Sequence, residues 1–291
     1  LGAIAAPSIG AAGGPIRSQM LAPLAVGVIF FIQGLQLPAR EALRGLTAWP
    51  LHAFCMGWMF IAYPLIALAI LFVAGDSLLP AFRTGILFTA LLPTTIATNA
   101  AYSSKAGGNP AVVLFNIVAG NALGIFLAPL ALAWLLAGAA EEPVIDLSPL
   151  AKALALQIVL PFLAGQALRP FVRAAIEKGR TALREGSSVM VYFIVYTSLC
   201  NFFVTMEVRR LPEGFGIMLM LTLLLLFTGS ALCWFALGRM PYPQSFRIAA
   251  FYAASQKTLA AGLPIANAVY RSMPGTALPP LALLILPLIL F

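Results

Sequence analysis

Long apolar segments alternate with short polar connectors along the whole chain. A helix that spans a bilayer needs about 20 predominantly apolar residues. Ten segments meet or approach this length, and glycine, proline and charged residues separate them. The pattern therefore predicts an all-α integral membrane protein with ten transmembrane helices. The predicted helices are residues 1–12, 20–37, 51–74, 82–104, 110–138, 149–168, 187–206, 214–238, 246–270 and 276–291.

The composition agrees with this class of protein. Of the 291 residues, 62% are hydrophobic and 9% are charged, whereas soluble domains contain about 45–50% apolar and about 25% charged residues. Ten helices leave no room for a second, soluble domain, so we expect residues 1–291 to form one transmembrane domain in the lipid bilayer. The sequence begins and ends within apolar segments, and the first and last helices are expected to be incomplete.

Basic residues are unevenly divided between the two sides of the predicted helices. Loops on the cytoplasmic side of a membrane protein are richer in Lys and Arg. This rule places the richer loops and both termini in the cytoplasm, and we expect the inner membrane of a bacterium. Because these loops carry the basic residues, the net charge of +8 does not indicate a nucleic-acid partner. The richer side carries Arg40, Arg44, Lys105, Arg169, Arg173, Lys178, Arg180, Arg184 and Arg239.

The ionisable residues also restrict the chemistry. All nine acidic residues lie in predicted loops or at helix edges, whereas Lys257 lies deep in the ninth apolar segment. Cys55, Cys200 and Cys233 lie in apolar segments without metal-ligand spacing, so we expect buried free thiols. The sequence has neither the paired histidines of a metalloprotease nor two intramembrane aspartates, and no serine stands in a nucleophile motif. These observations disfavour an enzyme, a transition-metal site and an organic cofactor.

Two predicted helices occupy equivalent places in the two halves of the chain. Arg83 opens the fourth helix and Arg247 opens the ninth, 164 positions later. Membrane transporters are often built from two structural repeats, with the binding site where broken helices of the repeats meet. We therefore divide the chain into repeats at residues 1–138 and 149–291. Since each repeat contains five helices, an odd number, the two repeats are inverted relative to each other.

Each of these two helices is interrupted near its centre by polar residues and a proline, at residues 92–100 and 256–264. Pro93 and Pro264 remove backbone donors, and at membrane depth the freed groups need protein partners or a water-filled cavity. Half-helix ends of this kind bind ions and substrates. The alternative is a pair of kinked helices whose threonines bond to their own backbone. The expected ion ligands are Thr94, Thr95, Thr98, Asn99, Asn116 and Gln256, and the expected substrate-cavity residues are Ser255, Thr258, Asn121, Asn201 and Pro264.

Polar and glycine-rich motifs accompany both interruptions, at residues 92–101, 107–109, 115–116, 120–124, 255–258 and 262–264. Together these motifs resemble the bile acid:sodium symporter superfamily, and most closely its SBF-like branch. The resemblance implies a panel and a core, with discontinuous helices 4 and 9 of the core crossing at their unwound centres. In the sodium-coupled members, two sodium ions behind the crossing help to drive uptake of an organic anion. By position, Thr98 and Asn99 match ligands of the first broken helix, and Gln256 matches the glutamine of the second.

One departure from the sodium-coupled members concerns the ion site. Those members carry a glutamate four residues before the glutamine, where this chain has Tyr252. Val113 and Ile117 stand near positions where hydroxyl ligands are expected, although Asn116 compensates if the register shifts by one residue. The sequence therefore leaves open whether Na⁺, H⁺ or no ion is coupled to transport.

Lys257 is open to several interpretations, because a charged side chain at the bilayer centre costs about 2.5–3.5 kcal/mol on insertion scales and is rarely idle. Its ammonium occupies a sodium position as a built-in cation bonded to Asn99, Gln256 and freed carbonyls, or binds an anionic substrate, or couples its protonation to transport. Alternatively, the side chain reaches a membrane surface. We favour the built-in cation, because the family carboxylate and the sodium charge would then have been lost together.

These observations favour a secondary active transporter that moves a small organic anion by alternating access at the crossing of the broken helices, with sodium coupling left open. Two alternatives remain. One is a membrane protein that regulates ion homeostasis without transport, and the other is a cation/proton antiporter, although such antiporters usually rely on a membrane carboxylate. The identity of the substrate, the direction of transport and the oligomeric state are not predicted.

Overall fold

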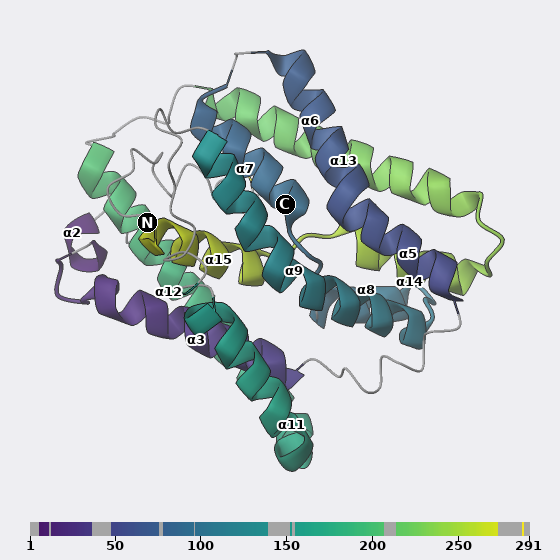
Figure 1. The fold of residues 1–291 in the computed structure, drawn as a ribbon, viewed down its shortest axis with the longest axis horizontal. Coiled ribbons are helices and arrows are strands. Elements are labelled where there is room, and N and C mark those ends of the chain that lie inside the picture. The colour runs from purple at the N-terminus through teal and green to yellow at the C-terminus, as the bar shows by residue number, and fades with distance from the viewer. Residues whose placement is uncertain are drawn as a thin grey trace.

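A computed structural model describes residues 6–11, 13–36, 48–75, 78–95, 97–138, 152, 155–206, 214–272 and 287 of the chain, and all its regular elements in these ranges are helices (Figure 1). Most follow one another along the chain with short connections. The elements are α2 (Pro7–Gly10), α3 (Ser18–Gln36), α5 (Trp49–Gly57), the π-helical turn η2 (Trp58–Ala62), α6 (Tyr63–Ala74), α7 (Pro80–Leu91), α8 (Ala97–Lys105), α9 (Pro110–Gly138), the π-helical turn η3 (Ala155–Val159), α11 (Leu160–Lys178), α12 (Arg180–Met206), α13 (Phe215–Gly238), α14 (Gln244–Ser255) and α15 (Leu259–Ser272).

Four helices in the described part are long and apolar enough to cross a membrane, and they establish a multi-pass membrane protein. They are Trp49–Ala74, Pro110–Leu132, Ala155–Lys178 and Phe215–Gly238. Met20–Gln36 is a shorter apolar helix. The predicted fourth and ninth helices appear as the pairs α7–α8 and α14–α15. Of the predicted first helix, residues 1–12, the structure describes residues 6–11, which contain the short α2. The predicted last helix lies outside the described residues except for residue 287.

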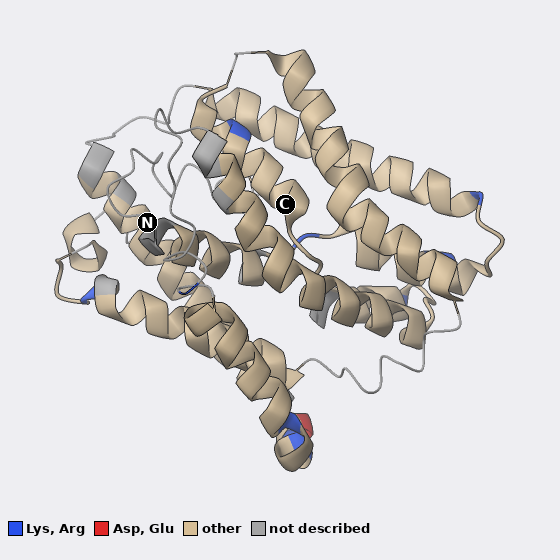
Figure 2. Cartoon of the chain, viewed as in Figure 1, with Lys and Arg blue, Asp and Glu red and all other residues tan. Residues whose placement is uncertain are grey.

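The connector predicted at residues 169–186 is helical in the structure, so this boundary was wrong. α11 continues to Lys178 and α12 begins at Arg180, so that Gly179 alone separates the two helices. The apolar pattern marks the part of a helix that lies in the membrane, and polar turns beyond the membrane interrupt the pattern without ending the helix. Figure 2 shows charged residues, coloured blue and red on the ribbon, gathered at this end of α11.

α3 packs closely against α11, and this contact is held at two glycines. A Cβ atom on Gly165 would lie 2.9 Å from the backbone nitrogen of Leu35, so any larger residue would force the helices apart. Gln166 donates from Nε2 to the carbonyl of Gly34 at 2.6 Å, and Arg169 donates to the carbonyl of Leu35 at 2.8 Å. These two side chains donate to carbonyls in the last turn of α3, for which the helix itself provides no N–H donor.

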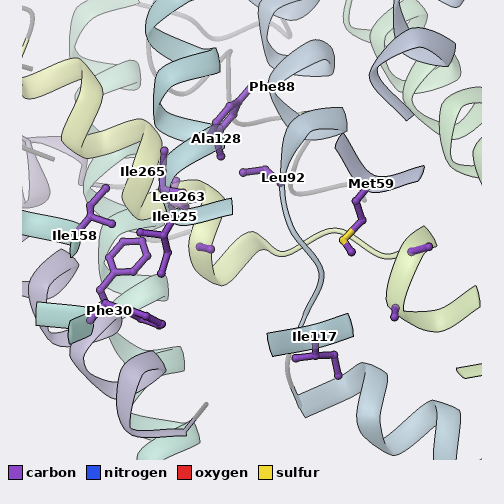
Figure 3. Packing of buried hydrophobic residues seen from close by; sticks show 14 of the residues in the cluster. Phe30, Met59, Phe88, Leu92, Ile117, Ile125, Ala128, Ile158, Leu263 and Ile265 are labelled. Atoms are coloured by element: carbon purple, nitrogen blue, oxygen red, sulfur yellow. The ribbon is translucent and has the colours of Figure 1, made fainter. Parts of the chain in front are cut away.

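A larger group of helices surrounds α9, which contacts α5, α7, α8 and α14. α6 and α13 pack against each other beside this group, and α15 contacts α3, α9 and α12. α15 therefore connects the larger group to the pair formed by α3 and α12. Figure 3 shows buried apolar side chains at this centre, among them Phe30 of α3, Ile125 of α9 and Leu263 of α15.

Candidate functional site

The fourth and ninth predicted helices are both broken, and their unwound segments touch. Residues 92–95 lie outside the helices between α7 and α8, and residues 256–258 lie outside them between α14 and α15. The first residue of each segment, Leu92 or Gln256, is extended. The backbone N–H of Thr258 donates to the carbonyl oxygen of Pro93 at 3.0 Å. Figure 3 shows the two unwound segments passing each other near Leu92 and Met59. The structure thus brings together the two segments that the sequence singled out.

The two breaks have different local causes. Pro93 has no N–H to continue α7, and Leu92 before it is extended, with φ −70° and ψ 149°, as residues before proline prefer. Pro264 was expected to interrupt the second helix, but α15 begins at Leu259 and passes through Pro264. That expectation was wrong, because a single proline removes one helical hydrogen bond without ending the helix here. The second break lies at residues 256–258, before the proline.

Lys257 lies at the crossing, buried with 5% of its surface exposed. Its Nζ atom donates to the carbonyl oxygens of Ala90 at 2.6 Å, Leu92 at 3.0 Å and Met59 at 3.2 Å. An ammonium group has three donors, so these carbonyls use all of them. The same Nζ atom lies 4.5 Å from the ring centroid of Tyr63, within the range of a cation–π interaction.

Met59 can accept from Lys257 because its carbonyl lies in the π-helical turn η2. In a regular α-helix this carbonyl would accept from the N–H of Tyr63, but that N–H donates to the carbonyl of Trp58 instead. The next residue, Pro64, has no N–H to offer. The turn therefore leaves the Met59 carbonyl free for the lysine. The sequence predicted no role for Met59. Pro64 was the one local feature that could have indicated a free carbonyl at this residue.

The freed carbonyls at the end of α7 and in the first unwound segment are engaged by protein donors. In an unbroken helix each would accept from the N–H four residues later, and the break removes that possibility. The donors are the side chain of Lys257 and the backbone of Thr258, both in the second unwound segment, and the side chain of Asn121 on α9. The acceptors and donors are Ala90 and Leu92 with Lys257, Pro93 with the N–H of Thr258, and Thr94 with Nδ2 of Asn121.

Asn99 joins α8 to α14 beside the crossing. Its Nδ2 atom donates to Oγ1 of Thr94 and to the carbonyl of Tyr252, the latter at 2.8 Å. Its Oδ1 atom is buried and has no hydrogen-bond partner in the structure. Of the other predicted ligands on this segment, Thr95 is partly exposed, and the side chain of Thr98 lies outside what the structure describes.

α9 supports the first unwound segment from one side. Besides its bond to Thr94 at 3.0 Å, Nδ2 of Asn121 donates to its own helix at Ile117. One turn later, a Cβ atom on Gly124 would lie 2.7 Å from Cβ of Pro93, so the absence of a side chain allows the proline to approach. Asn121 was predicted to line a substrate cavity, and here it holds the backbone of the broken helix.

The remaining predicted residues lie in different surroundings. Asn116 was predicted as an ion ligand; its Oδ1 is bonded to Nδ1 of His52 at 3.2 Å and its Nδ2 donates to the carbonyl of Val112. Asn201 lies on α12 and donates to the carbonyl of Thr197 at 2.7 Å. At the end of α14 and in the unwound segment after it, Ser255 is buried with an unpartnered Oγ, Gln256 is partly exposed and Thr258 is buried.

Each broken helix begins with an equivalent arginine contact. Arg83 donates from Nη1 to the carbonyl of Gly75, which caps the end of α6. Arg247 donates from Nη1 to the carbonyl of Gly238, the last residue of α13, at 3.3 Å. Both arginines thus satisfy a carbonyl at the end of the preceding helix. The sequence showed only that these two arginines occupy equivalent positions. The structure adds that they make the same kind of contact in both halves.

Electrostatically, the crossing is positive in the part of the chain that the structure describes. The acidic residues in that part are Glu177 and Glu185, and both are exposed and pair with Arg173 and Arg184. Lys257 therefore has backbone dipoles, and no described carboxylate, as its counter-charge. The carbonyl ends of α7 and α14 and the amide ends of α8 and α15 meet at the same place.

Comparison with known proteins gives a consistent result. The sequence profile of the SBF-like CPA transporter family matches residues 1–291. An uncharacterised protein of Pseudomonas aeruginosa is 30% identical over 271 residues, which are 92% of this chain and 78% of that protein. YfeH of Escherichia coli, named as a candidate symporter, is 25% identical, with 94% of this chain and 80% of that protein covered. The sodium/bile acid cotransporter 7 of Danio rerio is 27% identical, with 96% and 83% covered.

Proposed function

The chain belongs to the SBF-like CPA transporter family, and we propose that it is a secondary active transporter whose transport site is the crossing of residues 92–95 and 256–258. The family is one of transporters and not of enzymes, as the sequence predicted. The main support for the proposed site is Lys257, whose ammonium is held by the freed carbonyls of two different helices. Alternating access then takes place around a fixed point between the broken helices.

Lys257 acts as a resident cation in this proposal. Carbonyl ends of broken helices attract cations, and the relatives named sodium/bile acid cotransporters suggest that a sodium ion can serve there. In this chain, the carbonyls of Ala90, Leu92, Pro93 and Thr94 already accept from protein donors. A tethered ammonium would supply a positive charge from within the chain, so transport would not need sodium at this position.

The proposed substrate is a small organic anion. With the carbonyl end of α7 engaged by Lys257, the N-terminal ends of α8 and α15 remain, and helix N-termini attract anions. Ser255 and Gln256 lie next to these ends, and the hydroxyl of Ser255 has no hydrogen-bond partner. An anion bound at the N-terminal ends of α8 and α15 would therefore balance the partial positive charge of these helix ends.

A single sodium site is the second candidate, and it rests on Asn99. Its Oδ1 atom is buried without a partner, and an amide oxygen is a ligand that hard cations accept. Such a site would keep sodium coupling at one position while Lys257 replaces the other ion. The Asn99→Ala variant separates the two candidates. If Asn99 binds sodium, the sodium dependence of uptake should be lost in this variant; if it does not, the dependence should be the same as in the wild type.

The experiment that tests the function begins with a thermal-shift screen of organic anions in detergent, with sodium chloride or choline chloride as the salt. We expect stabilisation by particular anions, and their uptake into proteoliposomes, in both salts. Two results together would contradict the role of Lys257 as a resident cation. They are wild-type uptake that requires sodium, and uptake by Lys257→Met that continues with the same sodium dependence. If no anion stabilises the protein or enters the vesicles, the non-transporting regulator becomes the better interpretation.

We further propose two inverted repeats, residues 1–138 and 149–291, with the basic loops and both termini in the cytoplasm of a bacterium whose inner membrane holds the protein. The equivalent contacts of Arg83 and Arg247 support the repeats. In a cysteine-free background, a single cysteine at Lys178 should react with a membrane-impermeant maleimide only after the membrane is opened. A cysteine at Arg17 should react in intact cells, and labelling with the opposite sides would contradict the orientation.

A further inference from the structure

A cavity of about 480 Å³ lies between the ends of α3, α11 and α12, and none of its lining residues belongs to the crossing. Its volume is in the range of sites that bind small ligands, about 300–1,000 Å³. The lining side chains are apolar throughout. They include Ile32 and Leu35 of α3, Ala175 and Ile176 of α11, and Leu183 and Gly186 of α12.

The cavity follows from the way in which the three helices meet. α11 and α12 are joined by Gly179 alone, and both pack against α3. In the described part of α3, Ile32 and Leu35 of the last turns form one wall of the cavity, and the neighbouring ends of α11 and α12 form the others. The apolar run of α11 ends at residue 168, which places the cavity where the hydrocarbon core gives way to the polar headgroups.

Basic side chains border this apolar cavity. Residues 169–185 contain five basic and two acidic residues, a net charge of +3. Arg169 donates to the carbonyl of Leu35 at 2.8 Å, and Leu35 lines the cavity. α11 is kinked at Val172, with φ −114° and ψ 15°. Beyond the kink, Arg173 lies three residues before Ile176 of the lining, so these two residues share one face of the last turns of α11.

The acidic residues of this segment do not neutralise it. Glu177 pairs with Arg173 and Glu185 pairs with Arg184, and all four side chains are about 60% exposed or more. Exposed ion pairs of this kind contribute about 0–1 kcal/mol, so a stronger anion can compete for the arginines. Lys178 is exposed as well, and it lies next to Gly179 in the cavity wall.

We propose that this cavity binds an anionic phospholipid, with an acyl chain between α3, α11 and α12 and the phosphate against Arg169, Arg173 and Lys178. Basic pockets between transmembrane helices on the cytoplasmic side are sites of this kind. The apolar lining excludes a small hydrophilic anion as the whole ligand, and the basic border distinguishes an anionic lipid from a zwitterionic one. The proposal is independent of the transport site, because the two share no residue.

The test uses the whole protein in a mild detergent and measures the melting temperature with added phosphatidylglycerol or phosphatidylcholine. We expect phosphatidylglycerol to raise the melting temperature and phosphatidylcholine to have little effect. Glycerol 3-phosphate, which has the phosphate without the acyl chains, should have no effect at the same concentration. Equal effects of the two lipids, or stabilisation by glycerol 3-phosphate alone, would overturn the proposal.

Two variants separate the acyl and phosphate parts of the site. Gly186 lines the cavity and a Cβ atom there meets nothing within 4 Å, so Gly186→Leu adds apolar bulk at the cavity wall. This variant should lose the response to phosphatidylglycerol, whereas Gly216→Leu on α13, which is equally open, should keep it. Arg173→Gln combined with Lys178→Gln should weaken the apparent affinity about 30-fold, since each basic side chain near an anionic lipid contributes about a factor of five. An unchanged response in both variants would refute the site.

Discussion

The Nζ atom of Lys257 lies 2.6 Å from the carbonyl oxygen of Ala90, which precedes it by 167 residues. This hydrogen bond joins the second residue after α14 to the last turn of α7. The same ammonium reaches Met59, so three parts of the chain meet at one nitrogen. The lysine therefore contributes both the charge of the crossing and a link between elements that are far apart in sequence.

Removing the ammonium should destabilise the protein. In Lys257→Met, the carbonyls of Ala90, Leu92 and Met59 lose their donor, and buried polar groups without partners cost about 1–3 kcal/mol each. Because the substitution also removes a buried charge, the net loss should be near the lower end of that range. A thermal-shift measurement in detergent should show a lower melting temperature, and Lys105→Met, at an exposed site in the last turn of α8, serves as the control. A melting temperature equal to that of the wild type would mean that the three hydrogen bonds do not stabilise the crossing.

A smaller side chain at the same position should create a site for a free cation. Lys257→Ala leaves the carbonyl oxygens in place together with the space that the lysine occupied. Sodium or methylammonium ions should then raise the melting temperature of this variant, whereas the wild type and Lys257→Met should not respond, because their side chains fill the site. The cation response is read from melting curves over a concentration series. The same response in the wild type would argue for a separate cation site, for which Oδ1 of Asn99 is the candidate.

The apolar pattern predicted most helices within a few residues, and the agreement has a local cause. For α9 the predicted and observed limits coincide at residues 110–138. Asn109 stands immediately before this helix, and its Oδ1 accepts from the N–H groups of Ala111 and Val112 as a helix N-cap. A turn with Gly107 at φ +80° precedes it. Signals of this kind are carried by neighbouring residues, so the sequence alone displays them.

The partners at the crossing could not be predicted in the same way. The sequence identified Lys257 and the freed carbonyls, but it assigned Asn99 and Gln256 as partners of the lysine in place of Met59. The bond to Met59 spans 198 residues and depends on how α5 and η2 pack against α7 and α14. Asn116 was likewise assigned to the ion site because it stands near the expected register, whereas packing places it against His52. Contacts between distant segments require the tertiary structure.

The clamp on the first unwound segment can be tested at Asn121. Asn121→Leu keeps the approximate size of the side chain but leaves the Thr94 carbonyl without its donor. We expect a loss of about 1–3 kcal/mol in stability and impaired uptake of the anions found in the screen. Asn201→Leu is the matched control, because that amide donates within its own helix, to Thr197 on α12. Equal effects of both variants would show that the contact to Thr94 has no special role.

Close approach of Pro93 to α9 gives a steric test of the same crossing. A Cβ atom at Gly124 would lie 2.7 Å from Cβ of Pro93, a rigid ring that cannot rotate away. Gly124→Ala should therefore displace the unwound segment and reduce transport, although alanine favours the helix by about 1 kcal/mol over glycine. The melting temperature and the uptake rate should both fall.

The matched control for this steric test is Gly27→Ala on α3. Its Cβ atom would make an ordinary contact, 3.8 Å from Cγ of Pro161. Since this substitution gains helix propensity without a clash, its melting temperature should stay the same or rise, and uptake should be preserved. If Gly124→Ala behaves like Gly27→Ala in both measurements, α9 does not fix the position of the unwound segment, and the rigid crossing on which the proposed mechanism depends would need another support.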